Sequence, residues 1–545
     1  MVEVGEAARQ RQEIPPVAKE VALMLPEPTP PEWSEADLQV FDCLILPEHY
    51  LRRALKAIDF ESLRSKVAPH YSPDFGRPAE DPLVMLKLEF LQYHGNLSDR
   101  QVITRAETDV AYRYFLGLPM KAELPHPSSL CVFRGRLGVE GHREVFDAIV
   151  AQAREHGLVK DRLRLKDATH VIADVAIPTT LALLAQTRDK LLAAAEPFDT
   201  LRVTGERARI EAIHATTEGQ SDELRLIARV THLREIVAWV DELMPPEEVA
   251  IKGRWQVFEA ARRLAHKILA DQEDPKAGNR TRSVVDSDNR RGWHHQWFDG
   301  YLLDVMMDSD SEVITAVEVL PGNGDEAADA AVLVRQEEAA QGNKIEALSI
   351  DSVAFQGPVL EELQDPQGPA LDLYVPPKPE APAPYFPPQD FQEDVLHGTL
   401  TCPAGQTTTN RERNAHDTGW KYRFPRQTCA GCALQDRCMA KLPGTTGRTV
   451  IKNEYAEQYQ RMRAKALTAQ YAAVRSEHPK IERKLSELVR RHGARRTRYR
   501  GQWKVLCGQL MTATAANIKR IIHLLCAPKL ANEGMQKCVR TKVRK

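Results

Sequence analysis

The stretch RLRLKDATHVIADVAIPTT, residues Arg162–Thr180, constrains the fold more than any other part of this 545-residue chain. Its aliphatic and β-branched residues predict a β-strand, because such side chains suit a pleated, half-buried surface. Asp167 nevertheless lies within it, and an ionised carboxylate is costly to bury without a partner. Two interpretations are open. Asp167 is a turn residue of a hairpin over 166–169, since Asp favours turns, or a strand carries this carboxylate for a chemical purpose.

Strand character returns after residue 283, where SVVDSD is followed by GYLLDVMMD (300–308) and EVITAVEVLPGN (312–323). A helical stretch, EAADAAVLVRQEEAAQ, and a further strand, IEALSIDSVAF (345–355), come next. The β-β-α-β order predicts an α/β sheet with Asp351 at the carboxyl end of its last strand. Ligand sites in open α/β sheets gather at such strand ends.

Helical periodicity dominates two other regions. Between 36 and 140, Pro82 opens an apolar run and Ser98 with Gln101 has capping-box spacing. These short helices predict either a helix-turn-helix module that docks on DNA or a small bundle used for packing or dimer contacts. The chain also ends in helical stretches over about 453–500 and 502–526.

The expected fold class is a multi-domain α/β protein with an all-α N-terminal domain. The expected division is a mobile arm over 1–35, a helical N-terminal domain over 36–140, an α/β domain over 155–365 plus 453–526 with a helical insertion over 181–274, a Pro-rich linker over 366–395, a Cys-rich segment over 396–450 and a basic tail over 527–545.

Charge is distributed unevenly, although the formal net charge is only -2. From Arg475 to Lys504 there are eleven Lys or Arg against three Glu, and basic blocks of this kind often face nucleic acid. No apolar run reaches the length of a membrane span, and the N-terminus lacks the apolar core of a signal peptide. The sequence therefore predicts an intracellular protein without a membrane partner.

Four of the nine cysteines lie close together, at Cys402, Cys429, Cys432 and Cys438. In a reducing compartment a close cluster indicates metal binding rather than disulfides. A CxxC pair with two further thiols predicts a structural zinc site with four thiolate ligands. Ligation of an iron–sulfur cluster and unligated buried cysteines are the competing interpretations. A segment this poor in apolar residues favours zinc, because it would need a metal to stabilise it.

A third carboxylate, Glu482, lies in HPKIERKLSELVRRHG on a helix rich in Arg and Lys. Three converging oxygen ligands are what a hard divalent cation such as Mg²⁺ or Mn²⁺ requires. Taken alone, Glu482 is better explained as part of a solvated helix face or of an ion pair with Arg483 or Arg475.

These blocks together resemble bacterial insertion-sequence transposases of the DDE type, whose catalytic domain has an RNase-H-like fold. The blocks are KDATHVIADVAIPTT, GYLLDVMMDSDSEVITAVEVLPGNGDEAADA, the strand around Asp351 and YAAVRSEHPKIERKLSELVRRHGARRTRYRG. The stretch GRPAEDPLVMLKLEFLQYHGNLSDRQV, with YRYFLGL and FRGRL after it, is similar to the helical N-terminal domain of the same transposases. The resemblance extends from about residue 48 to 526 and implies an RNase-H-like mixed sheet flanked by helices.

The resemblance implies that Asp167, Asp351 and Glu482 form a triad that binds Mg²⁺ or Mn²⁺. It further implies metal-dependent cleavage at insertion-sequence ends and strand transfer into target DNA. Asp174, Asp286, Asp288 and Asp325 are competing carboxylates. The chain departs from the family after Asp351, where Ser352-Val353-Ala354-Phe355 stands in place of the usual Gly or Ala followed by Tyr. A catalytically inactive DNA-binding descendant, or a nuclease without strand transfer, are the alternative functions.

The resemblance also assigns DNA contacts around Glu482. Tyr471 and Arg475 match the family's upstream tyrosine and arginine, and Arg490, Arg491 or Lys504 takes the downstream basic role. RRHGARRTRYRGQWK adds basic residues to neutralise phosphates and aromatic rings, Tyr499 and Trp503, to stack on unpaired bases. The residues expected to contact DNA are Tyr471, Arg475, Arg490, Arg491, Arg495, Arg496, Arg498 and Lys504. The implied partners are double-stranded DNA, as terminal inverted repeats and target, and a second copy of the chain, in the bacterial cytoplasm at the nucleoid.

Overall fold

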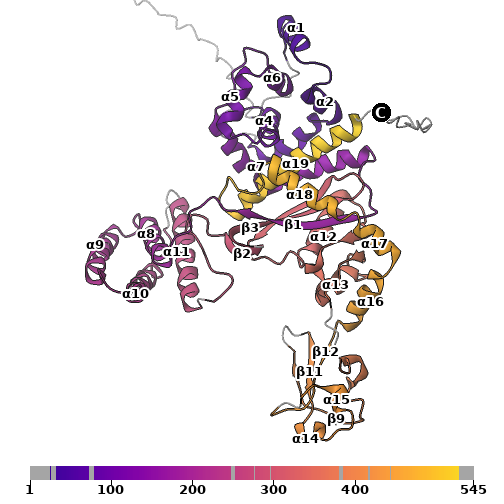
Figure 1. Ribbon diagram of the computed structural model, residues 1–545. Helices are drawn as coiled ribbons and strands as arrows, with labels where there is room; N and C mark the ends of the chain where they lie inside the picture. The colour runs from indigo at the N-terminus through magenta and orange to yellow at the C-terminus, as the bar shows by residue number, and fades with distance from the viewer. Residues whose placement is uncertain are drawn as a thin grey trace, which may run out of the picture.

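A computed structural model describes residues 25, 32–72, 79–246, 252–274, 276–294, 296–379, 384–414, 418–441 and 444–526. Most of the expected arm over 1–35 and all of the expected basic tail over 527–545 lie outside these residues. Searching the described residues finds no helix that is long and apolar enough to cross a membrane. Figure 1 shows a helical N-terminal domain above a central sheet, with a separate group of helices to one side and a smaller strand-rich segment below.

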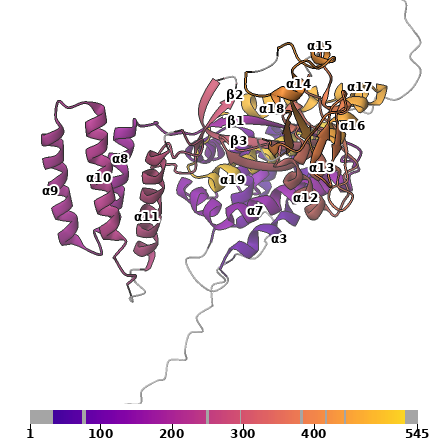
Figure 2. The ribbon, with the colours of Figure 1, turned by 90° about the horizontal axis from the view of Figure 1, so that it is seen from below.

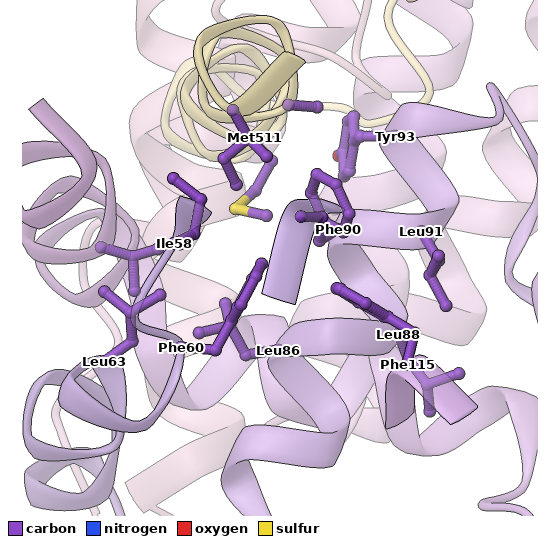
Figure 3. Packing of buried hydrophobic residues seen from close by; sticks show 14 of the residues in the cluster. Ile58, Phe60, Leu63, Leu86, Leu88, Phe90, Leu91, Tyr93, Phe115 and Met511 are labelled. Carbon is purple, nitrogen blue, oxygen red and sulfur yellow. The ribbon is translucent and has the colours of Figure 1, made fainter. Parts of the chain in front are cut away.

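The N-terminal domain is all-α, as expected. Its helices are α1 (Glu35–Leu44), α2 (Tyr50–Ala57), α3 (Arg64–Val67), α4 (Pro82–His94), α5 (Asp99–Thr108), α6 (Val110–Leu116) and α7 (Pro127–Glu155), with single 3₁₀ turns at Glu61–Leu63 and Ala68–His70. The predicted capping box is present, because Ser98 and Gln101 bond reciprocally at the start of α5. Phe60, Phe90 and Phe115 fill its core, and Met511 from the far end of the chain packs into the same cluster (Figure 3).

The central sheet is mixed. Its strands are β1 (Arg164–Ile172), β2 (Arg290–His294), β3 (Gln296–Asp308), β4 (Ile314–Pro321), β5 (Ala347–Ser349) and β6 (Asp372–Tyr374). The order is β2-β3-β1-β5-β6, with β4 also paired to β3. β1 runs antiparallel to β3 and parallel to β5, and β5 runs parallel to β6. The multi-domain α/β class and a mixed sheet flanked by helices are therefore confirmed.

Asp167 lies inside a continuous strand. β1 pairs with β3 over its whole length, and Asp167 stands opposite Val305. The interpretation of 166–169 as a hairpin turn is therefore wrong. The apolar and β-branched neighbours of Asp167 outweigh the turn preference of a single Asp, because both faces of β1 are covered.

Helices cover both faces of the sheet. α12 (Ala330–Gln341), α13 (Gly357–Gln364) and α16 (Ala456–Ala466) share a core with Met306 and Leu348. α17 (Ala469–Arg475), α18 (Pro479–Arg491) and α19 (Gln502–Cys526) lie on the other face with α7, where Leu165 and Val305 pack. The helix expected over 453–500 is thus three helices, because Thr468 caps α17 and Pro479 opens α18.

The helical insertion is present between β1 and β2. It consists of α8 (Thr180–Ala195), α9 (Thr200–Thr217), α10 (Asp222–Val240) and α11 (Lys252–Glu273). Leu191, Leu233 and Phe258 belong to a core that these helices form among themselves. Figure 2 shows the four helices standing beside the sheet rather than over it. The insertion therefore lengthens the connection without covering the sheet.

The Pro-rich stretch differs from the expected linker, because its residues 372–374 form β6, an edge strand of the sheet. A three-residue strand flanked by prolines gives too little periodicity to be seen in the sequence. The strand-rich segment that follows has two small sheets, β7 (Gln392–Asp394) with β8 (Thr399–Thr401) and β9 (Thr407–Thr408), and β10 (Arg411–Arg413) with β11 (Gly419–Arg423) and β12 (Thr449–Asn453). Two short helices, α14 (Arg426–Cys429) and α15 (Gln435–Cys438), carry three of the four clustered cysteines in and between them.

α19 joins the N-terminal domain to the sheet. Met511, Ala515 and Ile518 pack in the core of the N-terminal domain, whereas other α19 residues, Leu506 and Leu510 among them, pack against the sheet. The Asn517 side chain binds both backbone groups of one residue of β4: the Ile314 N–H donates to Oδ1 at 2.8 Å, and Nδ2 donates to the Ile314 carbonyl at 2.8 Å. These contacts fix α19 in register with β4.

A buried ion pair lies beside this junction. His142 of α7 and Glu89 of α4 are fully buried and face each other, with Nε2 3.4 Å from Oε1. Burial by itself would lower the pKa of His142, but the Glu89 carboxylate and a hydrogen bond with Cys507 of α19 raise it to about 10. The histidine is therefore charged in the folded protein at neutral pH.

This pair predicts a pH-dependent stability. A histidine whose folded pKa lies above its unfolded value of about 6.5 stabilises the fold fully below that value. The contribution is lost as the pH rises toward about 10, at no more than about 1.4 kcal/mol per pH unit. Urea unfolding should show that the free energy of unfolding of the wild type falls between pH 6.5 and 10. The fall should be smaller in the Glu89→Gln variant. Parallel curves for the two proteins would contradict the assignment.

Candidate active site

The sheet brings Asp167 and Asp351 together. β1 and β5 are parallel neighbours, and Leu165 pairs with Ser349 at the end of the ladder. Asp167 and Asp351 each lie two residues further along, so the two-residue period of a strand directs both toward the same face. Asp351 then caps the 3₁₀ turn Ser352–Ala354 by accepting from the Val353 N–H at 3.1 Å. Two carboxylates from distant parts of the chain thus converge.

The electrostatics of Asp167 agree with this convergence. Burial, together with the charges of Asp351 and Glu326, raises the pKa of the Asp167 carboxyl to about 7, against a hydrogen bond from the Ala168 N–H that lowers it. Repulsion between neighbouring carboxylates is relieved when a cation lies between them. The donor set, carboxylate oxygens in a partly buried position, fits a hard divalent cation.

Glu482, the third expected carboxylate, lies in the first turn of α18. Ile481 and Leu485 of this helix pack in the core on the same face of the sheet, and Glu482 is exposed beside them. Among the described residues, Glu482 forms no ion pair with Arg475 or Arg483, so the ion-pair alternative finds no support. The described side chains nevertheless include no group of three or more His, Cys, Asp or Glu that is placed to hold a metal ion. The charges of Asp351, Glu482 and Asp167 all act on Arg475, but the three carboxylates do not form a ligand set.

Arg475 stands among the three carboxylates. Its Nη1 donates to Ser349 Oγ at 2.9 Å and to the Ile350 carbonyl at 2.8 Å. Burial lowers the pKa of this guanidinium, whereas the charges of Asp351, Glu482 and Asp167 all raise it. Arg475 therefore holds the end of β5 in place and balances part of the negative charge of the site.

The competing carboxylates have structural uses. Asp286 is buried and accepts from the Gly501 N–H at 3.0 Å, and Asp288 accepts from the Gln502 N–H at 3.1 Å, so both lie at the start of α19. Asp325 accepts from the Ala327 N–H at 3.0 Å ahead of α12. Asp174 is exposed in the loop after β1.

Glu326 is a further acidic residue near the site, and the sequence reasoning missed it. Burial raises the pKa of its carboxyl, and the charge of Asp351 adds to the rise. Lys166 donates from Nζ to the Glu326 carbonyl at 2.6 Å and pairs with Asp304 at 2.8 Å. The adjacent acidic pair 325–326 ahead of a predicted helix was the only signal in the sequence that could have pointed to it.

The residues expected to contact DNA divide into two groups. Tyr471 is buried, Arg475 is bonded to β5, and Arg495 and Arg498 donate to the backbone carbonyls of His170 and Leu97. These four serve the protein's own packing in this structure. Arg498 is nevertheless exposed, and the other exposed members are Arg490, Arg491, Arg496 and Lys504. Of the two expected stacking rings, Tyr499 is only partly exposed and bonded to Tyr93, whereas Trp503 is 45% exposed.

The four clustered cysteines line one small cavity in the strand-rich segment. Cys402, Cys429, Cys432 and Cys438 converge there around Phe391 and Phe424. Burial raises the pKa of the Cys438 thiol and the charges of the other three thiols add to the rise. The Arg448 N–H lies 3.4 Å from Cys429 Sγ, as a donor to a thiolate would. No disulfide joins the described cysteines. Four thiols are the donor type that a tetrahedral zinc ion takes, but among the described residues these side chains, like the carboxylates, do not form a group placed to hold a metal ion.

Comparisons with known proteins find transposase domains in two parts of the chain. A family model described as a transposase domain matches residues 39–136, and one described as a transposase DDE domain matches residues 401–522. The second range contains Glu482 and the four clustered cysteines, whereas Asp167 and Asp351 lie outside both ranges.

One relative is an uncharacterized protein, ORF8 in the nfe locus of Rhizobium meliloti. It is 28% identical over 121 residues, which are 22% of this chain and 58% of that protein. The match therefore spans little more than half of the relative's length. No solved structure matches this chain. The two transposase family models, matched in chain order, support an insertion-sequence transposase of the DDE type.

Proposed function

We propose that this chain cleaves insertion-sequence DNA ends and transfers them to target DNA in a metal-dependent reaction. Asp167, Asp351 and Glu482 would hold Mg²⁺ or Mn²⁺. The observation that carries this proposal is the β1–β5 register, which directs Asp167 and Asp351 toward the same face of the sheet. Double-stranded DNA is the substrate and a second copy of the chain is the expected partner, at the bacterial nucleoid.

In this reaction the chain's own residues would hold the three carboxylates in position and would not themselves react. The bound cation supplies charge neutralisation for the attacking and leaving oxygens of an in-line phosphoryl displacement. Arg475 keeps Asp351 in place through its bonds to Ser349 and Ile350. α18 carries Glu482 on a helix fixed by Ile481 and Leu485. Rigid elements thus hold all three carboxylates, as phosphoryl transfer by positioning and charge requires.

The triad predicts a loss of chemistry without loss of DNA binding. Asp167→Asn, Asp351→Asn and Glu482→Gln should each lower cleavage of labelled transposon-end DNA by roughly three orders of magnitude, because a cation contributes several kcal/mol of charge stabilisation. Cleavage and strand-transfer products with Mg²⁺ or Mn²⁺ are the measurement, with gel-shift binding beside it. Asp174→Asn is the matched control, since Asp174 is exposed after the same strand.

The outcomes separate the alternative functions. Full activity in one triad variant would remove that residue from the site. A wild type that binds DNA but never cuts would be the inactive descendant, and cleavage without joined products would identify a nuclease.

For the cysteine cluster we propose a structural zinc ion held by Cys402, Cys429, Cys432 and Cys438. The small core around it, with Leu400 and Tyr422, offers few apolar contacts, so metal binding would contribute to its folding.

This proposal predicts about one zinc per chain by elemental analysis. Cys429→Ser and Cys432→Ser should each lose the metal and make the 396–450 segment sensitive to protease. Cys131→Ser, which changes an exposed cysteine in the N-terminal domain, should leave both properties unchanged. Iron with visible absorbance in place of zinc would identify an iron–sulfur site, and full metal content in both cluster variants would contradict ligation by these thiols.

A further inference from the structure

A basic groove lies where the N-terminal domain meets α18 and α19. Tyr50 and Arg53 of α2 line one side, and Arg483, Arg490, Arg491 and Lys519 line the other. In all, seven Lys or Arg side chains face this groove against two Glu. Figure 1 shows α2, α18 and α19 side by side at this seam, and α19 packs against α2. The charge of the groove thus comes from two domains that are far apart in the sequence.

Internal ion pairs use both carboxylates of the basic groove. Lys484 and Lys519 pair with Glu487 at 3.1 and 2.6 Å, and Arg520 pairs with Glu312 at 3.7 Å. Arg53, Arg483, Arg490 and Arg491 form no ion pair with any described residue. The groove therefore keeps an excess of positive charge that nothing in the described protein balances.

The unpaired guanidiniums on α18 form a row that begins next to Glu482. Arg483 is its immediate neighbour, and Arg491 follows eight residues later, about 12 Å along the helix axis. Duplex DNA carries one phosphate per strand about every 3.4 Å of its axis. The row therefore spans about three phosphates of one strand, a length that matches a polymer of phosphates rather than a single anion.

The opposite wall presents groups that lack partners. The Tyr50 hydroxyl and Arg53 Nε are buried polar atoms without a hydrogen-bond partner among the described residues. The Tyr50 ring stacks on His94 at 4.5 Å. Burial and the nearby cations lower the pKa of His94 to about 4, so this ring is neutral. Because both atoms are buried, the contact with phosphate on this wall would come from the outer end of the partly exposed Arg53 guanidinium.

We propose that the basic groove holds the sugar-phosphate backbone of duplex DNA where it leads away from Glu482. The N-terminal helices and the catalytic domain then bind one duplex jointly, through Arg53 from α2 and the arginine row of α18. This inference rests on the proposed function, because it takes DNA to be the substrate at the three carboxylates.

The test is the salt dependence of DNA binding by the full chain. A duplex of arbitrary sequence serves as probe, since phosphate contacts carry no sequence information. The triple variant Arg483→Ala/Arg490→Ala/Arg491→Ala should show a shallower slope of log affinity against log salt concentration. The slope should change by about 0.9 for each phosphate that the protein no longer neutralises, which is roughly 2 to 3 for the three substitutions together. Arg53→Ala on the other wall should change the slope by about 0.9.

Two controls accompany the test. The charge-retaining triple variant with Lys at the same three positions should keep most of the slope. A second triple variant removes three exposed basic residues on the α12 and α16 side of the sheet, Arg335→Ala/Lys344→Ala/Arg461→Ala. This variant should keep the wild-type slope of log affinity against log salt concentration. Should the alanine triple variant fail to fold, Arg53→Ala and the lysine variant still decide the question.

The outcomes distinguish the groove from the proposed function. If the wild type cleaves DNA while the groove variants keep the wild-type slope, the groove assignment is overturned and the transposase function stands. If the groove variants lose slope but the wild type never cleaves, the groove stands and the catalytic proposal fails. The assignment would also be overturned if the groove variants showed a shallower salt dependence only for single-stranded DNA and bound duplex DNA as the wild type does.

Discussion

The packing of α19 on two cores at once is the interaction on which the rest of the structure depends. Met511 and Ile518 complete the core of the N-terminal domain, while Leu506 and Leu510 complete the core against the sheet. A helix buried between two domains cannot leave one without exposing the apolar residues that the other requires, at about 25 cal/mol per Å². The N-terminal helices are therefore fixed relative to Glu482, and the basic groove at this seam has a defined shape.

A second constraint, the register of β1 against β5, fixes the candidate site. A shift of one residue would turn Asp167 or Asp351 to the opposite face of the sheet. The pairing of Leu165 with Ser349 prevents this shift, and Arg475 ties the end of β5 to α17. The cost of placing carboxylates together is visible in the raised pKa of Asp167. Such a site is prepared for a cation rather than for a stable ion pair.

The sequence predicted the parts of this structure that depend on local pattern. The position of Asp351 after an apolar strand and the capping box at Ser98 are read from neighbouring residues alone. It did not predict β6, because three residues show no period, nor Glu326, whose proximity to Asp167 follows only from the fold. It also did not predict that Arg495 and Arg498 bind backbone carbonyls of other elements. Contacts between distant segments are not encoded in local pattern.

The three carboxylates are separated by 351 − 167 = 184 and 482 − 351 = 131 positions, yet the long connections do little to weaken the site. Four helices with their own core account for about half of one gap, and the strand-rich cysteine segment accounts for much of the other. Each folds around its own apolar residues, so the sheet need only close a loop. The entropy of loop closure grows only with the logarithm of length, about 0.6 kcal/mol for each doubling. The site can therefore depend on the sheet register and on α18, while the insertions remain free to serve contacts of their own.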